Sequence, residues 1–235
     1  MPNSFTFGGV ASTTYGVYIS GNGTYKAPTR AYYNISVPGR DGDLLGISTR
    51  LENVTLTYPC GIVSSFDTNL AGLRSWLLAQ IGYAELSDTY HTDEYRLAVY
   101  KGGLEPEMVR DLKAGQFDLT FECKPQRFLN TGKTAVSITS GDTINNPTAF
   151  ASRPLIRTVG SGTLSVGGVT VTIAANTKTY IDIDCDMMDC FSGSDNCNSL
   201  VTFSGNDFPT LPAGTSAITY SGLTSVTVTP RWWRV

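Results

Sequence analysis

Apolar and polar residues alternate with a period of two along much of the chain, which is the pattern of half-buried β-strands. The clearest case is 117–123, where apolar residues fill one face and Asp118, Thr120 and Glu122 fill the other. The same alternation recurs in 31–37 (Tyr33, Ile35, Val37), 52–58 (Val54, Leu56, Tyr58) and 95–100 (Tyr95, Leu97, Val99). We expect each of these apolar sets to face a core.

Turn residues interrupt this alternation between residues 37 and 51. Pro38-Gly39 and Asp41-Gly42 are strong turn signals. We therefore interpret 31–58 as two strands joined by an exposed loop, forming a hairpin that projects from the body. A mobile surface loop remains the alternative interpretation.

One stretch has helical rather than alternating periodicity. Its apolar positions are Leu70, Leu73, Trp76, Leu77 and Ile81. This spacing predicts a single helix over about 68–82 that covers one face of the first sheet. Residues suited to its ends flank the stretch: Asp67, Thr68 or Asn69 at the start and Gly82 at the end.

The pattern changes near residue 130, beyond which no helical periodicity of useful length remains. Residues 163–173 are typical of a tight hairpin around Gly167-Gly168, because both turn positions tolerate positive φ. Further strands are expected at 180–185, 217–220 and 225–228. The fold class is therefore mainly β, with an α+β first domain over 1–132 and a β-sandwich second domain over 133–235.

Composition and charge narrow the function classes. Hydrophobic residues make up 41% of the 235 residues and charged residues only 16%, which argues against disorder. The formal net charge is −3, and no basic patch indicates specific nucleic-acid binding. Arg231 lies beside Trp232 and Trp233, whose side chains must face opposite sides of a strand. We expect one tryptophan in a core and the other at a joint or interface, with stacking on a sugar as the alternative.

Targeting signals are not evident. The first residues lack a basic region followed by an apolar core, so we expect folding in a cytoplasm. The apolar stretch 70–81 is too short to span a bilayer, so no membrane insertion is expected. Five cysteines, an odd number in a chain of this length, do not imply a disulfide framework.

Residues that could support chemistry are few. His91 is the single histidine, and we interpret it as an exposed loop residue. The run from Asp182 to Asp186 begins like a calcium loop but lacks the required Gly and Glu, so Asp182 and Asp184 are better read as the solvent face of a strand. The last three cysteines show no zinc-ligand spacing and suit burial or one adventitious disulfide. We predict no catalytic site, no metal and no cofactor.

Several motifs in order resemble those of the distal tail proteins (Dit) of siphophages. They are Phe5-Thr-Phe-Gly-Gly-Val with Tyr15-Gly-Val-Tyr, Val37-Pro-Gly-Arg-Asp-Gly-Asp-Leu, Phe121-Glu-Cys-Lys-Pro-Gln-Arg-Phe-Leu, Asn145-Asn-Pro-Thr with Ser152-Arg-Pro-Leu-Ile, Tyr180-Ile-Asp-Ile-Asp-Cys, and Val226-Thr-Val-Thr-Pro-Arg-Trp-Trp-Arg. Each motif alone is weak, whereas their order covers nearly the whole chain. The resemblance is weakest over about residues 60–115.

This resemblance implies a structural hub protein of the tail tip or baseplate of a virion. It implies a hexameric ring built by the first domain, a galectin-like second domain, and a channel that phage DNA crosses without specific binding. The implied partners are other copies of the chain, the tail-tube protein, the tail-tip protein and, in many phages, receptor-binding proteins. Assembly would take place in the host cytoplasm.

Ring closure needs heterologous contacts between neighbouring subunits, and sheet edges can supply them by strand addition. The hairpin turn is our candidate contact, through Val37, Pro38, Gly39, Arg40, Asp41 and Gly42. Arg231, Trp232 and Trp233 are further interface or joint candidates.

Three other functions remain open from the sequence. The second domain could be a carbohydrate-binding module, or the chain could be a hydrolase that uses a carboxylate pair. A tail-tube protein is a closer rival because it also builds hexameric rings, but it would be expected to lack the second sandwich.

Overall fold

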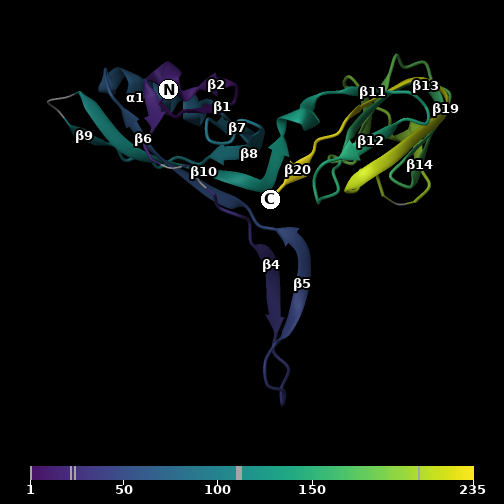
Figure 1. Cartoon of the computed structure of the whole chain (residues 1–235), viewed down its shortest axis with the longest axis horizontal. Helices are drawn as coiled ribbons and strands as arrows, with labels where there is room; N and C mark the ends of the chain where they lie inside the picture. Colours follow the sequence, from purple (N-terminus) through teal and green to yellow (C-terminus); the bar gives the residue numbers. More distant parts are fainter. Residues whose placement is uncertain (1, 22, 24, 110–112, 206) are drawn as a thin grey trace. The chain divides into compact units, whose positions relative to one another are not determined.

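Two compact units divide the chain (Figure 1). The computed structural model describes residues 2–21, 23, 25–109, 113–205 and 207–235. Contacts group Met1–Arg127 with Val235 in the first unit and Phe128–Arg234 in the second, five residues before the joint expected after residue 132. Strands account for 52% of the chain and helices for 11%, which confirms the mainly β class. No helix in the described part is long and apolar enough to cross a membrane.

The first unit contains a curled antiparallel sheet, a separate hairpin and, among its described residues, one α-helix. The sheet has the order β2-β1-β7-β8-β10-β6-β3, and β9 also pairs with β10. Its strands are β1 (Phe5–Phe7), β2 (Val10–Ala11), β3 (Val17–Ile19), β6 (Val54–Ile62), β7 (Ala84–Asp88), β8 (Glu94–Tyr100), β9 (Glu107–Val109) and β10 (Ala114–Leu129). The hairpin pairs β4 (Arg30–Ile35) with β5 (Leu44–Leu51), and the helix is α1 (Phe66–Ala79).

Aromatic side chains from several strands form the centre of the first core. Phe121 on β10 contacts the rings of Phe5, Phe7 and Tyr58, with centroids between 5.0 and 6.2 Å apart. The predicted inward face of 117–123 is buried as expected. α1 packs Leu70, Leu73, Leu77 and Trp76 against this cluster, so the helix covers the sheet as predicted.

The bounds of the helix differ from the prediction. α1 begins at Phe66 after Ser65, which adopts a left-handed conformation without a side-chain cap, so none of the three predicted capping residues has that role. Asn69 instead donates from its side chain to the carbonyl of Ser64. The helix ends at Ala79, and Ile81 is 98% exposed because the chain has already turned to the extended conformation at Gln80.

The prediction of a hairpin over 31–58 was partly wrong. Val54, Leu56 and Tyr58 are buried, but they belong to β6 of the main sheet, which pairs with β10. The partner of β4 is instead 44–51, as Figure 1 shows for the two strands that leave the sheet together. Alternation did not reveal β5 because its described side chains belong to neither hydrophobic core of the chain.

The orientation of β8 was predicted wrongly. Its buried residues are Glu94, Arg96, Ala98 and Tyr100, whereas the apolar set predicted to face the core is only partly buried. Glu94 can face inward because Arg127 on β10 forms an ion pair with its carboxylate. A buried charge with a partner removes the usual penalty against that face.

The second unit is entirely β apart from short 3-10 turns in its described residues. Its sheet has the order β11-β19-β13-β15-β16-β17, with β12 on β19, β14 on β13 and β18 on β14. The strands of this sheet are β11 (Val136–Ile138), β12 (Thr143–Asn146), β13 (Leu155–Val166), β14 (Val169–Ile173), β15 (Ile181–Asp184), β16 (Asp189–Ser192), β17 (Asp195–Asn196), β18 (Val201–Phe203) and β19 (Gly214–Thr229), and the 3-10 turns are η3 (Asn130–Lys133) and η4 (Asn198–Leu200). The last strand, β20 (Trp233–Arg234), pairs with β10 instead.

Two long strands organise this unit. The hairpin predicted at 163–173 is confirmed, since Gly167 and Gly168 take φ values of 57° and 85° between β13 and β14. The two strands expected at 217–220 and 225–228 are one strand, β19. Its register against β13 shifts around Gly160. Such irregularities bend a strand, and this one lets the sheet curl around a single core.

Candidate assembly interface

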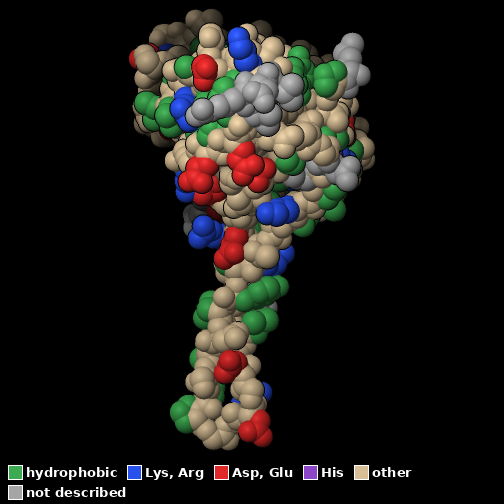
Figure 2. Space-filling view, turned by 90° about the vertical axis from the view of Figure 1, so that its left-hand side faces the viewer, with side chains coloured by type: hydrophobic (Ala, Val, Ile, Leu, Met, Phe, Trp, Pro, Cys, Tyr) green, Lys and Arg blue, Asp and Glu red, His purple; other side chains and the backbone are tan. Residues whose placement is uncertain are grey.

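The β4–β5 hairpin exposes an unusual amount of apolar surface. Its large exposed apolar side chains are Tyr32, Tyr33, Ile35, Leu44 and Leu45, with exposed fractions between 40% and 59%. Figure 2 shows hydrophobic side chains along the length of this hairpin. Contiguous exposed apolar surface of this kind typically marks an interaction site in a soluble protein.

Both faces of the hairpin carry these side chains. Tyr33 lies opposite Gly46 and Ile35 opposite Leu44, which places Tyr33, Ile35 and Leu44 on one face, called face A here. Because successive residues alternate between faces, Tyr32 and Leu45 lie on the other, called face B. A sheet with one core has one apolar face, so two apolar faces indicate two covering surfaces.

The hairpin has local reinforcement in place of a core. A Cβ atom at Gly46 would lie 2.2 Å from the ring of Tyr33, so the ring occupies the space that a side chain would fill. At the base, Thr29 accepts a hydrogen bond from the Glu52 backbone N–H at 2.9 Å and donates from its hydroxyl to the Glu52 carboxylate at 2.8 Å. These contacts hold the two strands together where they leave the sheet.

The structure places all the predicted contact residues of the turn at the tip of this hairpin. Val37 is half-buried, while Pro38, Gly39, Arg40, Asp41 and Gly42 are exposed. The Arg40 backbone N–H donates to the Val37 carbonyl at 3.2 Å, and Gly39 and Gly42 take φ values of 81° and 76°. The tip is thus a tight turn, and the loop between β4 and β5 exposes the charged side chains of Arg40, Asp41 and Asp43.

An incompletely covered strand edge lies next to the base of the hairpin in sequence. Among the described residues, β3 pairs with β6 at Cys60, Gly61 and Ile62, and Ser20 adds one backbone bond to Pro59. The remaining residues 54–58 of β6 have β10 as their described strand partner. The segment 20–29 is bonded at both ends of this stretch, since the Ser20 N–H donates to the Pro59 carbonyl and the Glu52 N–H donates to the Thr29 carbonyl.

The second group of predicted site residues lies in the other unit. Arg231 donates from Nη1 and Nη2 to the two carboxylate oxygens of Asp184 at 2.7 and 2.8 Å. Trp232 is buried in the core of the second unit. The Trp233 ring stacks on Phe150 at 4.5 Å and donates from Nε1 to the Ala151 carbonyl at 3.0 Å. These contacts use one face of the Trp233 ring and its N–H group.

The prediction that Asp182 and Asp184 face solvent was wrong, since they are only 3% and 4% exposed. Arg157 donates from Nε and Nη2 to Asp182, as Arg231 does to Asp184, so each buried carboxylate has a bidentate partner. Burial raises the pKa of Asp184, but the hydrogen bonds from Arg231 and from the Met187 backbone lower it more, and the net shift is downward.

The single histidine also differs from its expected setting. His91 is 16% exposed rather than freely exposed, and its Nδ1 lies 3.2 Å from Asp88 Oδ1. The same carboxylate accepts a hydrogen bond from the Tyr58 hydroxyl at 2.8 Å. Burial, then the nearby Asp88 charge, raise the pKa of Tyr58, so this hydroxyl stays protonated. Asp88 therefore fastens the loop after β7 to the core.

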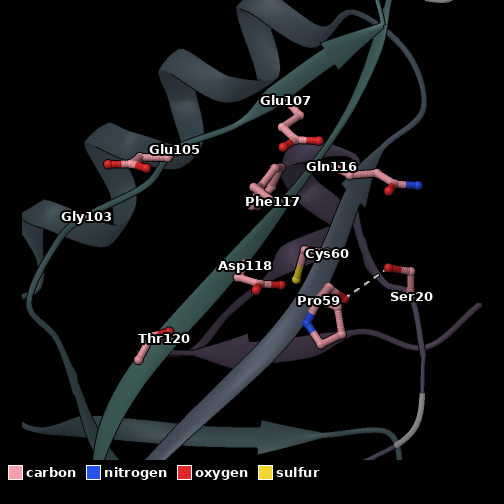
Figure 3. A pocket seen from close by; sticks show the side chains of 10 residues that line it. All are labelled: Ser20, Pro59, Cys60, Gly103, Glu105, Glu107, Gln116, Phe117, Asp118 and Thr120. Atoms are coloured by element: carbon pink, nitrogen blue, oxygen red, sulfur yellow. Dashed lines mark hydrogen bonds between the residues drawn. The ribbon is translucent and has the colours of Figure 1, made fainter.

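An acidic hollow lies over β6 and β10 (Figure 3). Its lining carboxylates are Glu105, Glu107 and Asp118. The nearby Cys60 thiol is a poor nucleophile because burial, with a further contribution from Asp118, raises its pKa to about 12. Among the described residues, no group of three or more histidine, cysteine or acidic side chains has the geometry to hold a metal ion.

Sequence reasoning missed the contribution of Tyr32, Leu44 and Leu45 to the hairpin surface. The available signal was the two doublets, Tyr32-Tyr33 and Leu44-Leu45. Adjacent apolar residues in a strand necessarily point to opposite faces, so each doublet indicates a ribbon that is apolar on both sides.

Comparisons with known proteins agree with this geometry. Residues 11–123 match the family described as the phage tail protein RIFT-related domain. The matched segment includes the hairpin and most of the sheet of the first unit. No curated protein is detectably similar to the chain in sequence.

Solved structures extend the likeness to the whole chain. The crystal structure of the Dit protein of phage SPP1, described as a paradigm of the hub adsorption apparatus in phages that infect Gram-positive bacteria, superposes with a TM-score of 0.69 and 12% identity over 100% of both chains. The phage P2 baseplate in its activated conformation gives TM-scores of 0.55 at 9% identity, over 97% of this chain and 98% of that chain with Ca, and over 99% and 98% with Sr. At such identities the likeness is one of fold. Together with the family match, it confirms the resemblance drawn from the sequence.

Proposed function

We propose that this chain, a structural protein of the phage tail hub, assembles into a hexameric ring through its β4–β5 hairpin. The observation that supports the proposal is that the hairpin exposes large apolar side chains on both faces, while its described side chains belong to neither core of the chain. An isolated two-stranded hairpin is marginally stable in water. Contact with neighbouring copies would supply the missing cover.

The contact has enough apolar surface to matter energetically. Each of the five large side chains is roughly half exposed, and burying such a half contributes about 1 kcal/mol. One hairpin would therefore contribute about 5 kcal/mol before the entropic cost of association, which is of comparable size. A single contact of this kind is weak, whereas a closed ring makes six of them.

Face A and face B would contact different surfaces. We infer that the hairpin lies between two parts of neighbouring copies, because one docking surface would leave either face A or face B in water. A sheet edge of a neighbouring copy would be a suitable position for strand addition by the same hairpin. The Arg40 and Asp41 side chains at the tip would then set the register through complementary charges.

In the proposed assembly, the ring joins the tail tube to the tail-tip protein and to receptor-binding proteins and leaves a channel for DNA. Assembly would take place in the host cytoplasm, and the mature location would be the virion tail tip. The chain would act through contacts rather than catalysis. A second unit spanning Phe128–Arg234 favours this reading over a tail-tube protein, which would be expected to lack it.

Substitution of each face separately tests the proposal. Tyr33, Ile35 and Leu44 on face A, or Tyr32 and Leu45 on face B, are replaced by serine, and the mass distribution is measured by sedimentation velocity. Each serine removes about 1 kcal/mol of burial, so either variant should weaken assembly by a factor of at least about 30.

The matched control replaces Met187 and Met188, an exposed apolar pair in the second unit, with serine. This control should assemble like the wild type. Normal assembly of the face B variant alone would contradict the two-surface arrangement. Normal assembly of both hairpin variants would contradict the role of the hairpin in the ring.

A further inference from the structure

Three cysteines of the second unit lie on one inward face of three neighbouring strands. Cys185 follows β15, Cys190 lies in β16 and Cys197 follows β17. They are 2%, 0% and 0% exposed and belong to the same core. All three are free thiols. Their shared face brings reactive atoms together within a small volume.

Cys190 and Cys197 are directly opposite one another. β16 and β17 pair Phe191 with Asn196, and the next pair along the ladder is Cys190 with Cys197. The Cys197 backbone N–H donates to the Cys190 carbonyl at 2.7 Å, which continues the ladder to this pair. Directly opposite residues in antiparallel strands have Cα atoms about 4.5–5.5 Å apart. Disulfides span Cα separations of about 4.4–6.8 Å, so the pair fits.

Cys185 is placed less favourably. The β15–β16 register pairs Ile183 with Cys190 and ends at Asp184 with Asp189, so Cys185 lies in the turn beyond the paired residues. Cys185 therefore has no cysteine directly opposite it in a strand ladder, whereas Cys190 has Cys197. The geometry therefore selects one pair among the three thiols.

We propose that Cys190 and Cys197 form a disulfide when the folded chain meets an oxidising small-molecule disulfide such as oxidised glutathione. The Cys197 thiolate attacks one glutathione sulfur, which breaks the glutathione disulfide and releases one glutathione thiolate. The Cys190 thiolate then attacks the Cys197 sulfur of the mixed disulfide and releases the second. The two cysteines lose two protons and two electrons. These protons and electrons are taken up by oxidised glutathione, which becomes two molecules of reduced glutathione.

Access to the pair comes from the adjoining sheet edge. β17 is a two-residue edge strand whose residues Asp195 and Asn196 are exposed, and the Cys197 thiol contacts the Asp195 carbonyl at 3.6 Å. Local opening of such an edge costs far less than global unfolding. Burial, followed by the nearby Asp189, raises the pKa of Cys190 to about 12, so its thiol stays protonated while the edge is closed.

The bond would thus form after folding, once the particle leaves a reducing environment. It would fasten β17 and η4 to β16 and close the free edge of the second sheet. The enclosed loop is short, so the gain in unfolding temperature should be a few degrees rather than tens.

Peptide mapping identifies the bond directly. The full chain is incubated with oxidised glutathione without denaturant, alkylated, and digested with a protease that cleaves before aspartate. Cys185, Cys190 and Cys197 then fall in separate peptides, 184–185, 189–194 and 195–206. We expect a cross-linked species of 189–194 with 195–206, together with a rise of a few degrees in Tm that a reducing agent reverses.

Alanine variants define the pair. Cys197→Ala should lose both the cross-link and the rise in Tm, whereas Cys185→Ala and the first-unit control Cys60→Ala should keep both. Peptides that remain reduced, or that carry only glutathione, would overturn the proposal. A cross-link that contains 184–185 in the wild type would overturn the choice of partner.

Discussion

Replacing residues 30–51 with Asn-Gly is expected to leave a folded chain that no longer forms rings. The Thr29 carbonyl and the Glu52 backbone N–H already form a 2.9 Å hydrogen bond at the base of the hairpin. That bond is the one that closes a two-residue turn, and Asn-Gly is the favoured sequence for such a turn. The excision therefore removes β4, β5 and their tip without adding strain to β6.

Sedimentation velocity and circular dichroism measure the two consequences together. The variant should keep the sheet signal and the cooperative unfolding of the first unit, and it should sediment as a monomer. A second variant keeps β4 and β5 but carries Arg40→Ser and Asp41→Ser at the tip. It distinguishes the contribution of the two strands to assembly from that of the turn. Rings formed by the excised chain would show that the contact lies elsewhere in the molecule.

Asp184→Asn is expected to destabilise the second unit by about 3 kcal/mol. The substitution leaves the Arg231 guanidinium, which is 28% exposed, without its anionic partner. Breaking a buried pair from one side costs about 3–5 kcal/mol, and the partial exposure of Arg231 places the cost at the low end. Hydrogen exchange of β15 and β19 against denaturant reports on this unit separately from the first.

The surface pair between Lys178 and Asp195 provides the matched control. Asp195 is 62% exposed in this pair, and exposed ion pairs contribute little to stability, so Asp195→Asn should cost far less than Asp184→Asn. Equal losses from Asp184→Asn and Asp195→Asn would mean that burial adds nothing to the Arg231–Asp184 interaction.

The ion pair between Arg231 and Asp184 makes the second unit sensitive to acid. In the folded chain, the pKa of Asp184 lies below the unfolded value of about 3.9. The stabilisation is therefore present above the unfolded pKa and is lost as pH falls through the lower folded value. The wild type should lose more stability than Asp184→Asn on acidification below pH 4, measured by denaturation at several pH values. Parallel pH profiles would contradict this assignment.

The elements predicted best from the sequence are those that pack one face against a core within the chain. The inward face of 117–123 and the glycine turn at 167–168 were correct because periodicity and turn chemistry are local properties. The turn at the hairpin tip was also predicted, since Pro-Gly and Asp-Gly pairs favour turns whatever the rest of the chain does. By contrast, β5 was missed because its apolar residues lie on both faces and no core of the chain selects between them.

Two errors in burial, on β8 and at Asp184, share one physical cause, which is charge pairing between distant segments. Glu94 is buried because Arg127 neutralises it from 33 positions away, and Asp184 because Arg231 does so from 47 positions away. A single sequence assigns such carboxylates to solvent, since hydropathy treats each residue alone. The prediction of the interface from the sequence is limited in a similar way, because the surface that would cover the hairpin would belong to another molecule.

Imaging of the purified wild-type protein tests the ring most directly. Negative-stain class averages, combined with a mass measurement in solution, should show six-fold rings with a central hole and a mass six times the 25.3 kDa of one chain. A chain that stays at 25.3 kDa at every concentration, with no annular particles in the images, would contradict the account.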